Sequence, residues 1–213
     1  MIKAALFDFD GVVVDTEPQY SLFWHRMGVE YIQKEDLEIL IKGQTLTYIF
    51  NTYFPGMEKE QAEITQQLNE FESNMQYDYI AGFEKFISEL RANGVKTAIV
   101  TSSNDIKMQA AYRAHPELKE IFDAILTSED FSESKPSPEC YLTGIKRLGA
   151  TPETAVVFED SFNGLKAGKA SDALVIGLST TNKKESIEAL CHAVVPDFTH
   201  LNHALLEKLN ATR

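Results

Sequence analysis

The sequence is poor in cysteine and has no long apolar run. Its 2 cysteines, Cys140 and Cys191, are too few for a disulfide framework among 213 residues, and they lack the spacing of a metal site. No stretch approaches the roughly 18 apolar residues of a transmembrane helix, and the apolar run near the amino terminus ends at Asp8, unlike that of a signal peptide. We therefore expect a cytoplasmic protein without a membrane partner.

Basic residues are also scarce relative to acidic ones. The chain has 20 Lys and Arg residues against 32 Asp and Glu residues, which gives a formal net charge of −12. An acidic chain repels a phosphodiester backbone or an anionic lipid surface unless its basic residues are concentrated in a patch, and no long Lys/Arg run is present. We expect no nucleic-acid partner, and we expect a monomer that binds a small molecule.

The composition is that of a folded globular protein. Hydrophobic residues make up 44% of the chain and charged residues 24%, a balance that can bury a core and argues against disorder. At this length the sequence predicts one large domain, or one domain with a small insertion.

Short apolar runs of strand length alternate with segments of helical period. In residues 83–90 the apolar side chains have the i, i+3, i+4, i+7 spacing of a helix, which Asn93 and Gly94 would end directly before another apolar run. Strand, helix and strand in repetition predict an α/β fold with a doubly wound parallel sheet. The predicted strands are residues 4–7, 97–100, 124–126, 155–158 and 174–176.

Residues 16–79 interrupt this alternation. They contain two helical patterns, around residues 22–27 and over 58–75, but no convincing strand. A connection of this length is more plausibly a small subdomain than a loop. We predict a catalytic core made of residues 1–15 and 80–213, and a helical insertion made of residues 16–79.

The first predicted strand ends in two carboxylates, Asp8 and Asp10, followed by Gly11. Ligands bind outside the carboxyl ends of the strands in an open α/β sheet, and alternation along an extended strand would direct both acids to one side. Two like charges that close need a cation or a shared proton. A polar turn after a strand remains an alternative. A calcium loop would need more oxygen ligands where the chain has three valines, at 12–14.

Two later segments are suited to an anion. Thr101, Ser102 and Asn104 follow a strand at a predicted helix start, where hydroxyls and free backbone N–H groups can bind phosphate, although they could equally be a simple helix cap. Lys135 lies beside Pro136 on a loop that the proline stiffens, so it offers a fixed positive charge, although an isolated lysine is more often only solvated.

A fourth strand end carries Glu159 and Asp160. Together with Asp8 these oxygens could bind Mg²⁺, while the alternative is an acidic helix start that complements the helix dipole. All four segments share a chemical logic. A carboxylate nucleophile can approach a phosphate dianion only when a metal ion, a lysine and hydrogen-bond donors offset the charge.

These residues resemble the haloacid dehalogenase superfamily, in its branch of small phosphatases and β-phosphoglucomutase-like proteins. The resemblance covers nearly the whole chain, because residues 16–79 are similar to the helical cap of that branch. The four motifs of the superfamily are matched in order by Asp8-Phe9-Asp10-Gly11-Val12, Thr101-Ser102-Ser103, Lys135-Pro136 and Glu159-Asp160-Ser161.

The resemblance implies a Rossmann-like core and a role for each motif. Asp8 would attack phosphorus to give an aspartyl-phosphate, and Asp10 would act as general acid and then as general base. The phosphoryl oxygens would be held by Thr101, the Ser102 amide and Lys135. Mg²⁺ would be bound by Asp8, the Asp10 carbonyl and Asp160, with Glu159 helping directly or through water.

Departures from the family pattern favour hydrolysis over isomerisation. The acid at position 10 favours phosphate monoesters, because dehalogenase members lack it and the related ATPases have threonine there. Mutase-type members place a histidine where Tyr20 aligns and an arginine where Leu46 aligns. We predict an Mg²⁺-dependent phosphohydrolase that acts on a small phosphorylated metabolite, with sugar phosphates among the candidates.

Two alternatives remain open. The first is a β-phosphoglucomutase-type sugar-phosphate mutase, and the second is a non-catalytic phosphate-sensing or partner-binding module, which would have no need of Asp10. The cap would select the leaving group, because the core motifs grip only the phosphoryl group. The candidates for substrate specificity are Glu17, Tyr20, Lys42, Gln44 and Asn104.

Overall fold

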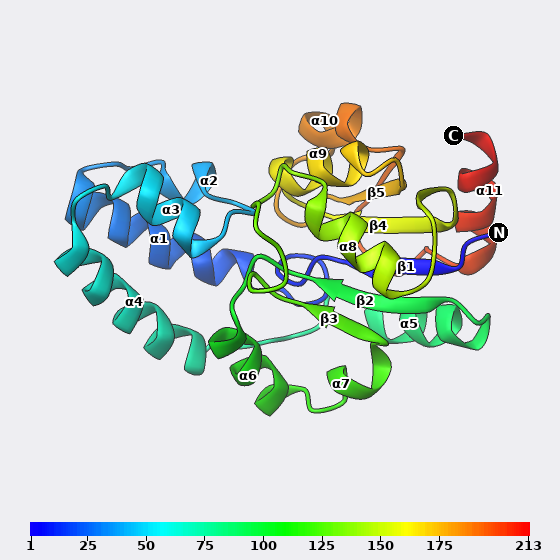
Figure 1. Ribbon diagram of the computed structural model, residues 1–213, viewed down its shortest axis with the longest axis horizontal. Helices are drawn as coiled ribbons and strands as arrows, with labels where there is room; N and C mark the ends of the chain where they lie inside the picture. Colours follow the sequence, from blue (N-terminus) through cyan, green and yellow to red (C-terminus); the bar gives the residue numbers. More distant parts are fainter.

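The computed structural model describes residues 1–213, and its centre is a sheet of six parallel strands (Figure 1). The strand order is β3-β2-β1-β4-β5-β6, so β1 is central and the chain winds away from it in both directions. The carboxyl ends of the strands therefore meet along one edge, where β1, β2 and β4 are neighbours. The strands are β1 (Ala4–Phe7), β2 (Lys96–Val100), β3 (Ala124–Leu126), β4 (Ala155–Glu159), β5 (Leu174–Leu178) and β6 (Ala193–Val195).

Helices cover both faces of the sheet, which explains why the central strands are continuous apolar runs rather than alternating ones. Phe7 and Phe158 face one side and stack with ring centroids 4.6 Å apart, whereas Leu6 and Val157 face the other side. The first face packs against α5 (Phe83–Ala92), α6 (Asp105–Ala114), α7 (Leu118–Ile121) and α11 (His203–Thr212). The second face packs against α8 (Glu139–Arg147), α9 (Phe162–Ala170) and α10 (Lys184–Ile187).

The predicted fold class is confirmed, and all five predicted strands are present. The sixth strand, β6, was missed: it is a half-buried edge strand of 3 residues, Ala-Val-Val, whose apolar run is as short as that of β3. No helix combines the length and the apolar character that crossing a bilayer requires.

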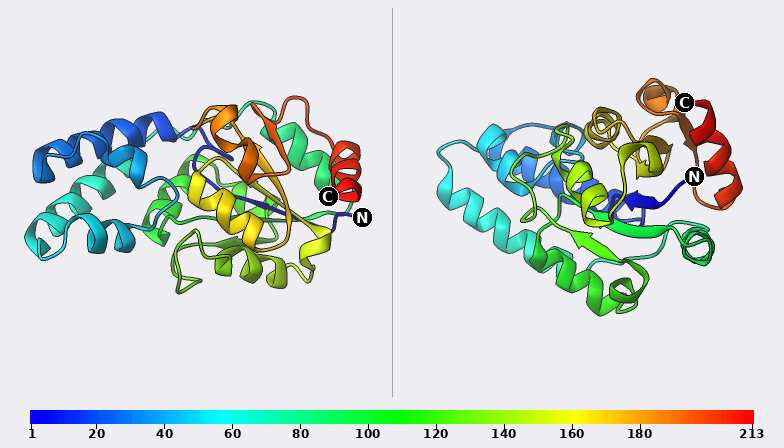
Figure 2. Two further views of the ribbon diagram at one scale, coloured as in Figure 1. Left: turned by 90° about the horizontal axis from the view of Figure 1, so that it is seen from above. Right: turned by 45° about the vertical axis from the view of Figure 1, so that its right-hand side comes forward.

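Four helices between β1 and α5 lie apart from the sheet, beyond the carboxyl ends of its strands (Figures 1 and 2). They have a core of their own, in which Phe23, Met27 and Phe54 are buried. Two of them match the predicted helical patterns, while α2 and α3 were missed because they are short. We call residues 16–79 the helical segment; its helices are α1 (Glu17–Ile32), α2 (Leu37–Leu40), α3 (Leu46–Tyr53) and α4 (Glu58–Ser73).

The helical segment is joined to the core by two connections that lie side by side. The backbone N–H of Asp15 donates to the carbonyl of Asp78 at 2.8 Å, and that of Ile80 donates to the carbonyl of Val13 at 3.0 Å. The chain therefore leaves the core and returns to it at a single place.

Candidate active site

A cavity of about 330 Å³ lies between the helical segment and the carboxyl ends of the strands. Its wall includes Asp8, Asp10 and Asp160 from the core, and all of the predicted specificity residues, Glu17, Tyr20, Lys42, Gln44 and Asn104. This volume is at the small end of the range for ligand sites. The cavity therefore suits a small metabolite rather than a polymer.

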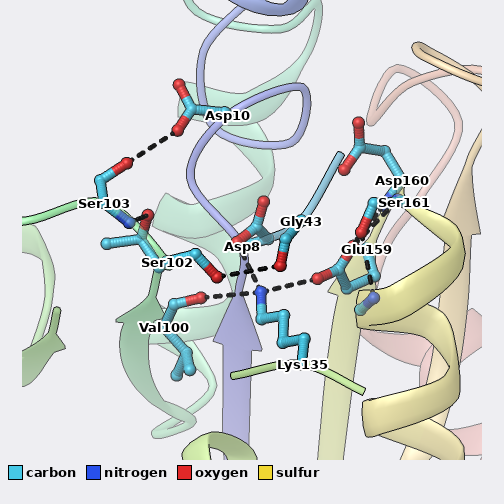
Figure 3. A network of polar contacts seen from close by, with 12 residues as sticks. Asp8, Asp10, Gly43, Val100, Ser102, Ser103, Lys135, Glu159, Asp160 and Ser161 are labelled. Carbon is cyan, nitrogen blue, oxygen red and sulfur yellow. Dashed lines mark hydrogen bonds and ion pairs between the residues drawn. The ribbon is translucent and has the colours of Figure 1, made fainter. Parts of the chain in front are cut away.

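Asp8 directly continues β1 and lies at the base of the cavity (Figure 3). It is 7% exposed, and its Oδ1 accepts a hydrogen bond from Lys135 Nζ at 2.7 Å. Burial raises the pKa of Asp8 to about 7; Lys135 opposes this rise and the Glu159 carboxylate adds to it. The second oxygen, Oδ2, is free to face the cavity.

Lys135 is buried beneath the cavity and is not part of its wall. Its Nζ contacts Asp8 Oδ1 and Glu159 Oε1, both at 2.7 Å, and the carbonyl of Val100 at 3.3 Å (Figure 3). Burial lowers the pKa of Lys135, but the carboxylates of Asp8 and Glu159 outweigh that effect and hold the pKa above its usual value. The lysine is thus the fixed cation between the two acids.

Glu159 has hydrogen bonds to both of its carboxylate oxygens. Oε1 accepts from Lys135 and from the Tyr141 hydroxyl at 2.8 Å, and Oε2 accepts from the backbone N–H groups of Asp160 and Ser161 at 2.9 and 3.0 Å. Position 164 must be glycine in this arrangement, because a Cβ there would lie 1.6 Å from Glu159 Oε1. Glu159 is therefore held in one orientation.

Asp8, Glu159 and Asp160 form a buried cluster in which one ligand oxygen of each lies within 4.8 Å of the others. Burial raises the pKa of Asp160, and the carboxylates of Glu17, Glu159 and Asp8 raise it further. The backbone approaches closely here: Gly11 has φ +72°, and a Cβ on it would lie 2.2 Å from Asp160 Oδ2. Three hard oxygen donors with only one lysine among them fit a divalent cation such as Mg²⁺.

The Asp10 carboxylate is not part of this cluster. It accepts a hydrogen bond from Ser103 Oγ at 3.1 Å (Figure 3). It also accepts from Thr16, and from Lys107, with which it forms an ion pair. Asp10 is therefore a second acid in the cavity wall, separate from the buried cluster, and its side chain is held by three hydrogen-bond donors.

The loop after β2 combines the two roles that the sequence left open. Asn104 caps α6 by accepting from the backbone N–H of Lys107 at 3.0 Å. Thr101 and Ser102 line the cavity, and the Thr101 hydroxyl accepts from the backbone N–H of Ser103 at 3.0 Å. A helix cap and a candidate anion site thus coexist in one loop.

Residues 42–45 of the helical segment form hydrogen bonds to the core. Ser102 Oγ donates to the carbonyl of Gly43 at 3.1 Å, and the amide of Asn163 donates to the carbonyl of Lys42 at 3.1 Å. The hydroxyls of Thr45 and Ser134 are 2.8 Å apart. We call residues 42–45 the closing loop, because all four line the cavity and three of them bond to the core.

Sequence reasoning missed four charged residues of the cavity wall, namely Glu38, Glu72, Lys107 and Glu129. Lys107 is 2% exposed and lies in the first turn of α6, and that position next to the predicted cap was an available signal. Glu72 is 5% exposed and accepts from the Tyr20 hydroxyl at 2.6 Å. Nothing distinguished Glu72 in the sequence from the solvated acids of the same helix.

The chain is similar to known proteins over most of its length. The family model for haloacid dehalogenase-like hydrolases matches residues 2–172. The chain is 29% identical over 187 residues to a phosphorylated carbohydrates phosphatase of Thermotoga maritima, covering 80% of this chain and 82% of that protein. It is also 29% identical over 203 residues to a bifunctional riboflavin kinase/FMN phosphatase of Arabidopsis thaliana, but it spans only 51% of that protein's length.

Solved structures agree on the fold. The crystal structure of a β-phosphoglucomutase from Clostridium difficile has a TM-score of 0.80 and 20% sequence identity, covering 100% of this chain and 98% of that one. Family, fold class and the assignment as a phosphoric monoester hydrolase are thereby confirmed, and the chain belongs to the haloacid dehalogenase-like hydrolase family.

Proposed function

We propose that the protein is an Mg²⁺-dependent phosphohydrolase that cleaves a small phosphorylated metabolite through an aspartyl-phosphate on Asp8. The observation that carries the proposal is the pairing of two acids in one cavity: Asp8, bonded through a single oxygen to Lys135, and Asp10, held separately by Lys107. Within this proposal residues 1–15 and 80–213 are the catalytic core and residues 16–79 are its cap. Cytoplasmic location, the monomeric state and the absence of nucleic-acid and membrane partners stay predictions.

The two acids divide the chemistry. Asp8 Oδ2 attacks phosphorus, and the bond from phosphorus to the leaving oxygen breaks with its electron pair on that oxygen, which Asp10 protonates. Asp10 then takes a proton from water, whose oxygen attacks phosphorus and releases Asp8. Thr101 and the Ser102 amide, in the cavity wall, would hold the phosphoryl oxygens. Lys135, bonded to Asp8 beneath the cavity, would supply positive charge beside them.

Asp8, Asp160 and the Asp10 carbonyl would hold Mg²⁺, with Glu159 acting directly or through water. When bound, the ion supplies positive charge that offsets the repulsion between a carboxylate nucleophile and a phosphate dianion. The buried cluster of Asp8, Glu159 and Asp160 supports this assignment.

Hydrolysis is favoured over mutase activity by the cap side of the cavity. Tyr20 and Leu46, which align with the histidine and arginine of mutase-type members, both line the cavity. Neither side chain carries the charge that would grip a second phosphate. The similarity to a phosphatase of phosphorylated carbohydrates supports the same choice and places sugar phosphates among the substrates to test.

Metal removal tests the proposal. We expect phosphate release from a panel of sugar and alcohol monophosphates in the presence of Mg²⁺, loss of that activity with EDTA, and recovery when Mg²⁺ is added back in excess. Glucose 1-phosphate is included, and glucose 6-phosphate formation is followed separately. Full activity in EDTA would contradict the metal assignment, and isomerisation without phosphate release would favour the mutase.

Replacing Asp10 by asparagine should slow turnover by an amount that depends on the leaving group. Loss of a general acid costs about 100- to 10,000-fold for a poor leaving group such as a sugar hydroxyl. The cost should be much smaller for formation of the aspartyl-phosphate from p-nitrophenyl phosphate, because nitrophenolate leaves without a proton. Burst-phase kinetics with both substrates measure this difference, and an equal slowing of both would argue against the assigned role.

A further inference from the structure

Unsatisfied polar atoms are concentrated in the wall of the cavity. Buried polar atoms nearly always have a hydrogen-bond partner, and only five buried side-chain atoms of this protein lack one. Three of them, Glu72 Oε2, Gln44 Oε1 and Glu38 Oε2, belong to residues of the helical segment that line the cavity. The other two are in α11, at the opposite end of the protein (Figure 1). All three cavity atoms are acceptors.

Glu72 is the most constrained of the three. It lies in the last turn of α4, next to α6 (Figure 1), and it is only 5% exposed. Its Oε1 accepts from the Tyr20 hydroxyl at 2.6 Å, so the carboxylate is fixed while Oε2 has no partner. A buried carboxylate oxygen without a donor is costly. A donor that a substrate brings would remove that cost.

Glu72 also lies on the leaving-group side of the cavity. The centroid of the Tyr20 ring, whose hydroxyl donates to Glu72, lies 4.5 Å from Lys107 Nζ. Lys107 forms the ion pair with Asp10, so Glu72 and Asp10 are two partners apart in one network. Burial raises the pKa of Glu72, and the charge of Lys107 opposes that rise. Asp10 is the acid assigned to the leaving oxygen, so groups attached to that oxygen would extend toward Glu72. Glu38 is less strictly unpartnered, because His25 Nδ1 lies 3.5 Å from its Oε2.

The positive charges of the cavity wall are already paired. Its lysines are Lys42 and Lys107, and no arginine or histidine lines it. Lys42 forms an ion pair with Glu17, and Lys107 forms one with Asp10. A second phosphate on the substrate would therefore find no free cation and would meet the unsatisfied oxygen of Glu72.

We propose that Glu72 and Gln44, with Glu38 at their side, are specificity-determining residues that accept hydrogen bonds from hydroxyl groups of the leaving group and reject a leaving group that carries a second phosphate. The substrate class is then a monophosphate of a neutral, polyhydroxylated alcohol. This inference rests on the proposed function, because the role of Asp10 as general acid identifies which side of the cavity receives the leaving group.

The experiment compares substrates across two substitutions and a control. Glu72→Leu removes both acceptors, Glu72→Gln keeps one, and Glu70→Gln changes an exposed acid of the same helix. For the best sugar monophosphate we expect kcat/KM to fall about 10- to 100-fold in Glu72→Leu and less in Glu72→Gln. With p-nitrophenyl phosphate, which has no hydroxyl groups, both variants should stay within about twofold of the wild type and of Glu70→Gln.

A matched pair of substrates tests the rejection of a second phosphate. We expect the wild type to prefer glucose 6-phosphate over glucose 1,6-bisphosphate by about 100-fold or more, and Glu72→Gln to narrow that ratio. A wild-type preference for the bisphosphate overturns the proposal. So does an equal loss on the sugar and nitrophenyl substrates, which would indicate a structural role. A strong preference for glucosamine 6-phosphate over glucose 6-phosphate would assign the acceptors to an ammonium group and overturn the hydroxyl assignment.

Failure of the proposed function gives a different result. If the wild type hydrolyses neither p-nitrophenyl phosphate nor any sugar phosphate, the phosphohydrolase assignment is wrong. Binding then decides the specificity proposal by itself. Calorimetry with Asp8→Asn, which cannot turn over the ligand, should still show tighter binding of glucose 6-phosphate than of the bisphosphate, and weaker binding of the monophosphate when Glu72→Leu is added. Equal affinities in all of these titrations overturn it.

Discussion

Replacing Asp8 by asparagine should lower kcat by about 10,000-fold or more. Asparagine has nearly the shape of aspartate, so the change removes the nucleophilic oxygen while it preserves the packing at the end of β1. Asp8 is the acid best placed for this role, because it lies at the base of the cavity and its Oδ1 is held by Lys135 at 2.7 Å. Phosphate release from the best monophosphate measures the effect.

The control is Asp78→Asn, a neutralisation of an exposed acid, which should leave kcat unchanged. Acid quenching during turnover should also trap phosphate on the wild-type peptide that contains Asp8, and none on that peptide in the variant. Turnover within tenfold of the wild type in Asp8→Asn, or a phosphate adduct on a different residue, would show that Asp8 is not the nucleophile.

Replacing Lys135 by methionine should destabilise the metal-free protein by about 3–5 kcal/mol. The side chain is completely buried and is the only cation bonded to Asp8 and Glu159, at 2.7 Å from each. Methionine fills a similar volume, so the main effect is the loss of charge compensation for two buried carboxylates. Denaturant unfolding in EDTA measures the free energy of unfolding.

The stability that Lys135→Met loses should increase as the pH rises. Asp8 already has a raised pKa of about 7, and Lys135 is the charge that opposes the rise. When a carboxyl group has a raised pKa in the folded state, the free energy of unfolding of the protein falls as the pH rises from the unfolded-state pKa toward the folded-state pKa. Without Lys135 this fall extends to higher pH, so the difference in unfolding free energy between variant and wild type should widen above about pH 7.

The control is Lys85→Met, on the exposed surface of α5, which should change the free energy of unfolding by less than about 0.5 kcal/mol. A similarly small loss of unfolding free energy in Lys135→Met would show that Lys135 does not compensate the charges of Asp8 and Glu159.

The sheet was predictable because each of its buried strands is a short apolar run bounded by polar residues. Apolar runs with polar or turn-forming residues on each side located β1 and β3 to the residue. The same signal is present at β6, where Ala-Val-Val is followed by Pro196, but a run of 3 residues is too short to be assigned from pattern alone. In the site, the gathering of acids and hydroxyls at one cavity was predictable, because the topology brings the strand ends together, whereas the role of each residue stays a prediction.

The part of the site that the helical segment contributes was less predictable from the sequence. The polar candidates that it proposed, such as Gln44, do line the cavity, but Glu72 and Lys107 were not among them. Their burial depends on how α4 packs against α6, and that is a tertiary contact between segments about thirty residues apart. Hydropathy gives a buried glutamate and a solvated one the same score.

The adjacent connections at Asp15 and Ile80 determine which contacts a movement of the helical segment could change. A body attached at one place can rotate only about that place, so displacement grows with distance from it. Glu17 and Glu72 lie close to the connections in sequence, whereas the closing loop is far from them. A swing would therefore leave Glu72 near Asp10 almost in place, while it moves Gln44 and breaks the hydrogen bonds between the core and the closing loop at Gly43 and Thr45. Contact of the leaving group with Glu72 could then precede contact with Gln44 and formation of the closing-loop hydrogen bonds, and the two events could be altered by separate mutations.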